Sequence, residues 1–363
     1  MEVAAAVDRP PRRTLRPRRA TIVDVAARAG VSKGLVSFVL NDRPGVAPDT
    51  RRRILAAVEE LGWRPNQTAR ALVNARAYAI GLVLARPAEL IAADPFFPAF
   101  IAGVETELSA RQASLVLQVV PHFEAELAAY RQLTTDNRVD GVIVADLRVD
   151  DPRPRILAEL GLRAVTLGRP EGRRRCPAVV LEDVAGVVDS VEHLVALGHQ
   201  RIAFVSGPEP FLHARNRRQA WRSTLQRLDL RDDLSSNGDF SGTSGARATA
   251  RLLRRRATER PTAIVYANDL MAVAGVAAIA RSGRRVPDDV SVVGYDDIAV
   301  AAHLHPALTT VTQDAMAWGR AAARAVFDLV EGESTDDVEL APARLVIRGS
   351  TAAPADATKP PRG

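Results

Sequence analysis

The stretch TIVDVAARAGVSKGLVSFVLNDRPGV, residues 21–46, decides how the rest of the chain is interpreted. Thr21 is suited to cap a first helix, with Asp24 as the acidic member of a capping box, and Gly30 is suited to end it. Ser32 then caps a second helix, in which Val36, Val39 and Leu40 recur at helical spacing. Two short helices joined by a tight turn predict a helix-turn-helix. On periodicity alone, a generic pair of small helices remains the alternative.

A third helix completes this head. Residues 41–45 form a loop, Pro48 fits the first turn of a helix, and Gly62 ends that helix. Its inner face carries Ile54, Val58 and Leu61. In a helix-turn-helix the second helix enters the major groove with its N-terminal residues. Its exposed positions here are Lys33, Gly34, Ser37 and Phe38.

The charge of the chain is concentrated at its beginning. Residues 1–76 hold 15 Lys and Arg against 7 Asp and Glu, a balance of +8, whereas the remainder holds 34 against 36, a balance of −2. This asymmetry favours a polyanion-binding head on a neutral body. Six arginines lie within residues 9–19, however, so a solvated basic tail is the alternative interpretation of the charge alone.

From Tyr78 onward, short apolar runs alternate with helical segments, which predicts parallel sheets covered on both faces. Two series of strands indicate two similar α/β lobes. The expected strands are 79–85, 114–120, 141–145 and 164–167, then 201–207, 263–269 and 291–297, with a last strand at 345–350. The expected helices include 98–111, 184–197, 214–228, 244–256 and 269–282.

Composition excludes several classes of protein. The longest uncharged apolar stretch, Leu270 to Ala280, is too short to cross a bilayer, and residues 1–20 lack the pattern of a secretory signal. We therefore expect a cytoplasmic, nucleoid-associated protein. The single cysteine, Cys176, excludes an internal disulfide and a cysteine-cluster metal site, and the six histidines show no metal-ligand spacing. No phosphate-cradling glycine motif follows the first strand, so we expect neither an enzyme nor a cofactor. An extracytoplasmic solute-binding protein would have no use for residues 21–73.

Ordered motifs along the chain resemble those of the lactose-repressor family of bacterial regulators. The family pattern matches from Thr21 to Asn41 and from Leu61 to Leu72, with Trp63 for the usual tyrosine. Further matches follow in order: DPFF (94–97), HLVALGHQRIA (193–203), ANDLMA (267–272), VPDDVSVVGYDDI (286–298), PALTTVTQ (306–313) and RGST (348–351). No single motif is decisive, but the series covers about residues 21–351 and is highly specific.

The resemblance implies a DNA-binding head followed by a hinge helix. It implies DNA contacts at Thr21, Ser32, Lys33, Gly34, Ser37, Phe38, Asn41, Asn66, Arg70 and Leu72. The residue at the place of Leu72 wedges into the minor groove; the alternative is that Leu72 begins the next core. Phe38 replaces the polar residue common at its position, so Lys33 is expected to carry most of the direct polar readout. Phe38 as a partly buried structural residue stays open.

The resemblance also implies an effector pocket between the lobes. The expected contacts are Phe96, Phe97, Arg215, Phe240, Asn268, Asp296 and Gln313, with Arg215 as the clamp and Phe240 stacking on a ring. This set suits a polyol such as a sugar. As alternatives, Asp296 caps a turn and Phe240 belongs to the core. The arginine runs 173–175 and 254–256 are interpreted as solvated surface, and Trp221 and Trp318 as packing residues.

Together these interpretations predict a homodimeric transcription regulator, a repressor in preference to an activator, that binds palindromic operator DNA and a carbohydrate effector. The expected organisation is a disordered arm (1–20), a helix-turn-helix domain (21–64), a hinge and linker (65–77), a two-lobed domain (78–351) and a flexible tail (352–363). The first lobe is expected at about 78–177 and 314–342, and the second at about 178–311 and 343–351.

Overall fold

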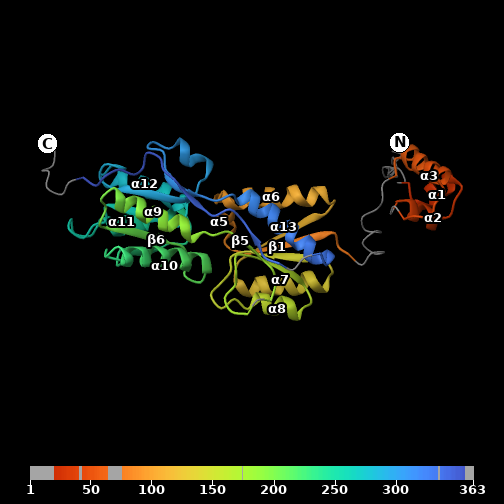
Figure 1. Ribbon diagram of the computed structural model, residues 1–363, viewed down its shortest axis with the longest axis horizontal. Helices are drawn as coiled ribbons and strands as arrows, with labels where there is room; N and C mark the ends of the chain where they lie inside the picture. Colours follow the sequence, from red (N-terminus) through yellow and green to blue (C-terminus); the bar gives the residue numbers. More distant parts are fainter. Residues whose placement is uncertain (1–19, 41–42, 64–75, 174, 334–335, 356–363) are drawn as a thin grey trace, which may run out of the picture. The chain divides into compact units, whose positions relative to one another are not determined.

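The computed structural model describes residues 20–40, 43–63, 76–173, 175–333 and 336–355. The chain divides into two compact units, residues 1–76 and residues 77–363 (Figure 1). Each unit has its own apolar core. No helix among the described residues is long and apolar enough to cross a membrane.

The first unit is a head of three helices, as the sequence predicts: α1 Ile22–Ala29, α2 Lys33–Leu40 and α3 Pro48–Glu60. The expected capping box is present, because the Thr21 hydroxyl accepts from the Asp24 N–H and the Thr21 N–H donates to the Asp24 carboxylate at 2.8 Å. Gly30 ends α1 at a φ of +65°, which favours glycine. The three helices bury Val25, Val36, Val39 and Ile54 between them.

The first lobe of the second unit contains a six-stranded parallel sheet in the order β11-β5-β4-β3-β1-β2. Its strands are β1 Ala79–Ala85, β2 Ser114–Val120, β3 Gly141–Val144, β4 Arg163–Leu167, β5 Ala178–Val180 and β11 Val338–Glu339. Its helices are α5 Ala88–Ala93, α6 Phe96–Ala110, α7 Phe123–Thr135, α8 Arg153–Glu159 and α13 Ala315–Glu331.

Side chains of β1 alternate between the two faces of this sheet. Ile80, Leu82 and Leu84 pack with α6 and α13, whereas Ala79 and Val83 pack with α7 and α8. Helices α6 and α13 touch through backbone, because a Cβ at Gly103 would collide with the Met316 carbonyl and one at Gly319 with the Phe100 carbonyl. These two glycines therefore set the close approach of the two helices.

The second lobe contains another six-stranded sheet, in the order β12-β10-β9-β8-β6-β7. Its strands are β6 Ile202–Ser206, β7 Ser235–Asn237, β8 Ala263–Tyr266, β9 Ser291–Asp296, β10 Thr309–Thr312 and β12 Arg344–Val346. Its helices are α9 Val184–Ala196, α10 Leu212–Arg227, α11 Gly242–Leu253 and α12 Asp269–Arg281, with a 3-10 turn at Ala299–His303. Pairing is parallel except between β10 and β12, where it is antiparallel.

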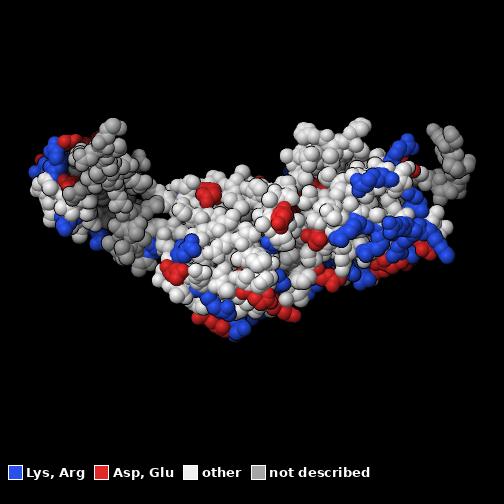
Figure 2. All heavy atoms as spheres, turned by 180° about the vertical axis from the view of Figure 1, so that it is seen from behind, with Lys and Arg blue, Asp and Glu red and all other residues white. Residues whose placement is uncertain are grey.

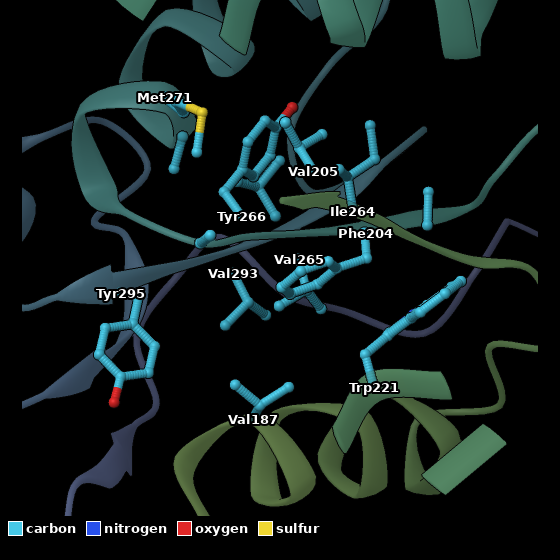
Figure 3. Close-up of a cluster of buried hydrophobic side chains, with 14 of the residues drawn as sticks. Val187, Phe204, Val205, Trp221, Ile264, Val265, Tyr266, Met271, Val293 and Tyr295 are labelled. Atoms are coloured by element: carbon cyan, nitrogen blue, oxygen red, sulfur yellow. The ribbon is translucent and has the colours of Figure 1, made fainter. Parts of the chain in front are cut away.

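The core of the second lobe lies on both faces of its sheet. In Figure 3, Val187 and Trp221 reach the sheet from one side, and Met271 lies on the other. Trp221 stacks on Phe204 with ring centroids 5.8 Å apart, which confirms its interpretation as a packing residue. Because α9 and α10 cover one face and α11 and α12 the other, the ligand-accessible edge of the sheet is the carboxyl end of its strands.

The chain crosses between the lobes three times: after β5, after β10 and after β11. The first lobe continues past its expected end at about residue 177, since β5 (Ala178–Val180) pairs with β4 in the first sheet. Its three residues are too few to give a recognisable strand pattern next to Pro177. The last strand is also shorter than predicted and antiparallel, because the chain returns from the first lobe in the opposite direction.

Candidate functional site

The candidate DNA-reading surface is the N-terminal part of α2 in the head. Ser32 caps this helix, its hydroxyl accepting from the Leu35 N–H at 3.3 Å. Lys33, Gly34 and Phe38 are exposed and Ser37 is half-buried, while Val36 and Val39 face the core.

Phe38 does not serve as a buried structural residue of the head. Its side chain is 43% exposed, and the Arg43 guanidinium lies 5.3 Å from its ring centroid. An apolar ring is therefore presented to solvent on the same helix as Lys33. Thr21 is also exposed, whereas the predicted contacts Asn41, Asn66, Arg70 and Leu72, and with them the predicted hinge helix, lie outside the described residues.

A cavity of about 260 Å³ lies between the two lobes of the second unit. This volume is near the lower end of small-molecule pockets, which run from about 300 to 1,000 Å³. Residues from the first lobe, the second lobe and the crossovers line it: Arg86, Asp94, Phe96, Phe97, Asp146, Asp183, His213, Arg217, Phe240, Asn268, Asp296, Gln313 and Trp318, among others. It therefore lies where the carboxyl ends of both sheets face each other.

Six of the seven predicted pocket residues line this cavity: Phe96, Phe97, Phe240, Asn268, Asp296 and Gln313. Asn268 also has a structural task, because its side chain accepts from the Met271 N–H at the start of α12 and donates to the Phe240 carbonyl at 3.0 Å. Phe240, with a φ of +69°, is thereby held against Gly207, where a Cβ would collide with its ring.

The seventh predicted residue, Arg215, does not line the cavity. It forms an ion pair with Glu171 of the first lobe, and its side chain is 42% exposed. Arg217 lies in the cavity instead, two residues further along α10. Two residues of helix correspond to a rotation of about 200°, so the two side chains leave the helix on opposite sides. Of the arginines in the run 215–218, the structure places Arg217 in the cavity wall and the predicted Arg215 outside it.

Arg217 is buried and bound on several sides. Its Nε donates to Asp183 at 3.0 Å, its Nη1 donates to the Ala267 carbonyl at 3.0 Å, and its guanidinium lies 3.5 Å from the Tyr295 ring centroid. Burial raises the pKa of Asp183, and the Arg217 charge opposes that rise. Arg217 is thus a fixed positive group at the junction of crossover and second lobe.

Sequence reasoning missed a second ion pair, between Arg86 and Asp146. Arg86 Nε and Nη2 each donate to one Asp146 oxygen at 2.5 Å. The Arg86 guanidinium also lies about 5 Å from the rings of Phe97, Phe211 and Phe240. Burial works against ionisation of Asp146, but the charge of Arg86, its hydrogen bonds and smaller contributions from neighbouring groups together lower the pKa of that carboxyl.

The signal for this pair was present in the sequence. Arg86 follows the buried run 79–85 directly, and Asp146 follows the buried run 141–145. Charged residues at the carboxyl ends of parallel strands lie on the edge where such sheets bind ligands.

Asp94, Asp296 and Gln313 supply further acceptor groups in the cavity beside these ion pairs. Burial raises the pKa of Asp94, and burial together with the Asp94 charge raises that of Asp296 well above its ordinary value. Gln313 Nε2 donates to Asp296 at 2.6 Å, while Gln313 Oε1 is buried without a hydrogen-bond partner among the described residues. Asp296 has a φ of +110°, a strained conformation of the kind that collects at binding sites.

Aromatic rings form the rest of the cavity wall. His213 stacks against Phe211 and Phe240 with centroids 5.7 and 5.6 Å away, and burial lowers its pKa to about 3, so it is neutral at pH 7. Trp318, interpreted from sequence as packing, both lines the cavity and packs edge-on against Phe96. Within the described ranges, no group of three or more His, Cys, Asp or Glu residues is arranged to hold a metal ion.

The lobes are also joined directly at the edge of the cavity. The Leu212 N–H donates to the Leu147 carbonyl at 2.7 Å, and the Val149 N–H donates to the Pro210 carbonyl at 3.1 Å. Arg148 and Phe211 form the antiparallel bridge between these bonds. We call this contact, with the Arg215–Glu171 ion pair beside it, the interlobe bridge.

Known families and proteins are similar to the chain over most of its length. Residues 21–66 match the family described as bacterial regulatory proteins, lacI family, and residues 191–351 match a periplasmic binding protein-like domain. The HTH-type transcriptional regulator CelR of Thermobifida fusca is 37% identical over 344 residues, 92% of this chain and 99% of that protein. The lactose operon repressor of Escherichia coli (strain K12) is 34% identical over 351 residues, 94% of this chain and 93% of that protein.

Solved structures are similar over the same length. A complex of the transcriptional regulator CelR with cellobiose has a TM-score of 0.70 at 36% identity, covering 92% of this chain and 100% of that chain. A lac repressor dimer bound to operator and the anti-inducer ONPF has a TM-score of 0.80 at 32% identity, covering 93% and 100%. These relatives are transcription regulators and not enzymes. The chain therefore belongs to the lacI family of bacterial regulatory proteins and is a transcription regulator.

Proposed function

We propose that this regulator is a repressor that binds a palindromic operator as a homodimer, and that a sugar or sugar derivative in the interlobe cavity controls its binding. It acts in the cytoplasm, associated with the nucleoid. The observation that carries the proposal is the composition of the cavity, whose wall includes residues of both lobes and of the crossovers. A ligand there contacts both lobes at once, so it favours arrangements of the lobes in which both sets of contacts are made and shifts the population toward them.

On the DNA side, the exposed N-terminal part of α2 supports major-groove readout. Lys33 donates to guanine, Phe38 contacts a thymine methyl, and Gly34 allows the backbone to approach closely. Thr21, Ser32, Ser37 and Asn41 are proposed to fix the head on the DNA. Asn66, Arg70 and Leu72 are proposed to belong to a hinge that enters the minor groove.

On the effector side, the cavity offers an apolar wall and a few polar groups, which suits a sugar ring with its hydroxyls. Phe96, Phe97 and Phe240 are proposed to face the ring, and Asn268, Asp296 and Gln313 the hydroxyls. Arg217 takes the role that the sequence assigned to Arg215. That CelR forms a complex with cellobiose makes cellobiose the first compound to test.

The test combines DNA selection with ligand titration on the full chain. Duplexes selected from a random pool should contain an inverted repeat, because a two-fold dimer reads two half-sites. A sugar that raises the melting temperature should change operator affinity by about 5- to 150-fold, corresponding to about 1–3 kcal/mol of coupling. Selection without a repeat would contradict the dimer, and stabilisation without any change in affinity would contradict control by the sugar.

The role of Lys33 has its own test. Lys33→Ala should weaken discrimination between operator variants by about 1–3 kcal/mol at one base pair. Arg51→Ala, on α3 of the same head, serves as a charge-matched control. Intact discrimination in Lys33→Ala would show that another residue reads the operator.

A further inference from the structure

We propose that the cavity accepts ligands without negative charge and excludes phosphorylated sugars, because its arginines are already neutralised and its carboxylates outnumber them. This inference rests on the proposed sugar effector and specifies its charge class. The described residues that line the cavity include three arginines, Arg86, Arg169 and Arg217, against five carboxylates, Asp94, Asp146, Glu182, Asp183 and Asp296.

Arg86 is unable to act as a phosphate ligand in this arrangement. Its Nε and Nη2 are committed to both oxygens of Asp146, in the bidentate geometry that a phosphate would otherwise use. The rings of Phe97, Phe211 and Phe240 lie around its guanidinium, and the whole residue is 6% exposed. A phosphate would have to displace a buried carboxylate to reach it.

The charge of Arg217 is also neutralised by a buried carboxylate, that of Asp183. Asp183 accepts from its Nε, the Ala267 carbonyl accepts from its Nη1, and the Tyr295 ring covers one face. Its side chain is 6% exposed. What Arg217 still offers a ligand is a hydrogen-bond donor beside a neutralising carboxylate, which suits a hydroxyl better than a dianion.

The third arginine, Arg169, lies at the cavity edge and is also held in ion pairs. Arg169 pairs with Asp337 and Glu339 of the first lobe, and its side chain is 56% exposed. The one histidine among the described lining residues, His213, is neutral at pH 7 because burial lowers its pKa to about 3. None of the basic side chains that the structure describes in the cavity wall therefore carries uncompensated charge.

The acceptor groups that no arginine neutralises point to a ligand rich in hydrogen-bond donors. Asp94 approaches from the first lobe and Asp296 from the second, and the Asp94 charge disfavours ionisation of Asp296. Gln313 Oε1, buried and without a partner among the described residues, adds a third acceptor beside Asp296. Sugar hydroxyls donate to all three, whereas a phosphate brings about two negative charges at pH 7 and no strong donor.

The experiment compares matched pairs by calorimetric titration at pH 7.5: glucose, cellobiose, maltose and trehalose, each against its 6-phosphate. A non-phosphorylated sugar should bind saturably and its phosphate at least about 100-fold more weakly, as expected when like charges are brought together. Equal or tighter binding of the phosphate would overturn the inference and leave a sugar effector standing. If no member of any pair binds while operator binding persists, the sugar effector fails and the inference fails with it.

Charge variants test the physical reason. Asp94→Asn removes a carboxylate while keeping its shape, so the preference for the non-phosphorylated sugar should fall at least about tenfold. Asp189→Asn, an exposed residue of α9 that does not line the cavity, is the matched control and should keep the preference. For the unmodified chain, lowering the pH to 5.5 makes the phosphate a monoanion and should also reduce the preference. An unchanged preference in both tests would contradict exclusion by charge.

Discussion

Replacing Arg217 by alanine should destabilise the two-lobed unit, whereas the same change at Arg215 should not. The side chains of Arg217 and Asp183 are 6% and 16% exposed, so Arg217→Ala leaves a buried carboxylate without its partner. Removing one member of a buried ion pair costs about 3–5 kcal/mol. The Arg215–Glu171 pair is 42% and 38% exposed, and an exposed pair contributes about 0–1 kcal/mol.

Thermal unfolding of the full chain, followed by calorimetry, measures this difference. At about 2 °C per kcal/mol for a unit of this size, Arg217→Ala should lower the Tm of the two-lobed unit by about 6–10 °C, and Arg215→Ala by less than about 2 °C. Both variants should still show the transition of the separate head, which serves as an internal reference.

A double variant identifies the cause of the loss. Adding Asp183→Asn to Arg217→Ala removes the unpaired charge, so part of the lost Tm should return. The reasoning is refuted if Arg217→Ala melts within 2 °C of Arg215→Ala, or if the double variant melts below the single one.

Three further outcomes follow from the described contacts. Burial raises the pKa of Asp269 from 3.8 to about 7, so ionisation of this carboxyl is disfavoured in the folded state. The free energy of unfolding should therefore fall as the pH rises from about 4 to about 7, and Asp269→Asn should flatten that fall in denaturation experiments at several pH values. Gly207→Ala should push the Phe240 ring out of place, costing about 1–3 kcal/mol of stability and weakening ligand binding in titrations; unchanged stability and binding would contradict this clash. Thr21→Ala removes the hydroxyl cap of α1 and should lower the stability of the head alone by about 1 kcal/mol, so an unchanged head transition would argue against the cap.

The sequence was sufficient for the elements with a strong pattern. The seven-residue run AIGLVLA was expected as a strand and is β1 residue for residue, and Thr21, Gly30 and Pro48 correctly placed the helices of the head. Strands of two or three residues, such as β5 and β11, were missed because so short a stretch shows no alternation. Their place in the sheet is decided by neighbours far away in the chain.

The sequence predicted most residues of the candidate site, but not which arginine of α10 faces the cavity. Aromatic and amide positions followed from motifs, but HARNRR offers three arginines in four positions, and only the packing of α10 decides which one faces inward. The same holds for Arg86 and Asp146, whose partnership depends on β1 and β3 lying side by side. Charged residues at the ends of strands can be located from the sequence. Which of them form ion pairs depends on the order of the strands in the sheet.

The three crossings between the lobes also determine the order in which a growing chain can complete its structure. The head is finished once about its first 63 residues have left the ribosome. The first lobe, by contrast, takes Ala322, Val326 and Phe327 of α13 into its core, and its edge strand β11 ends at Glu339. A nascent chain with almost all of the second lobe made therefore still exposes the apolar face of β1 and α6. The DNA-binding end of the molecule thus matures long before the end that regulates it.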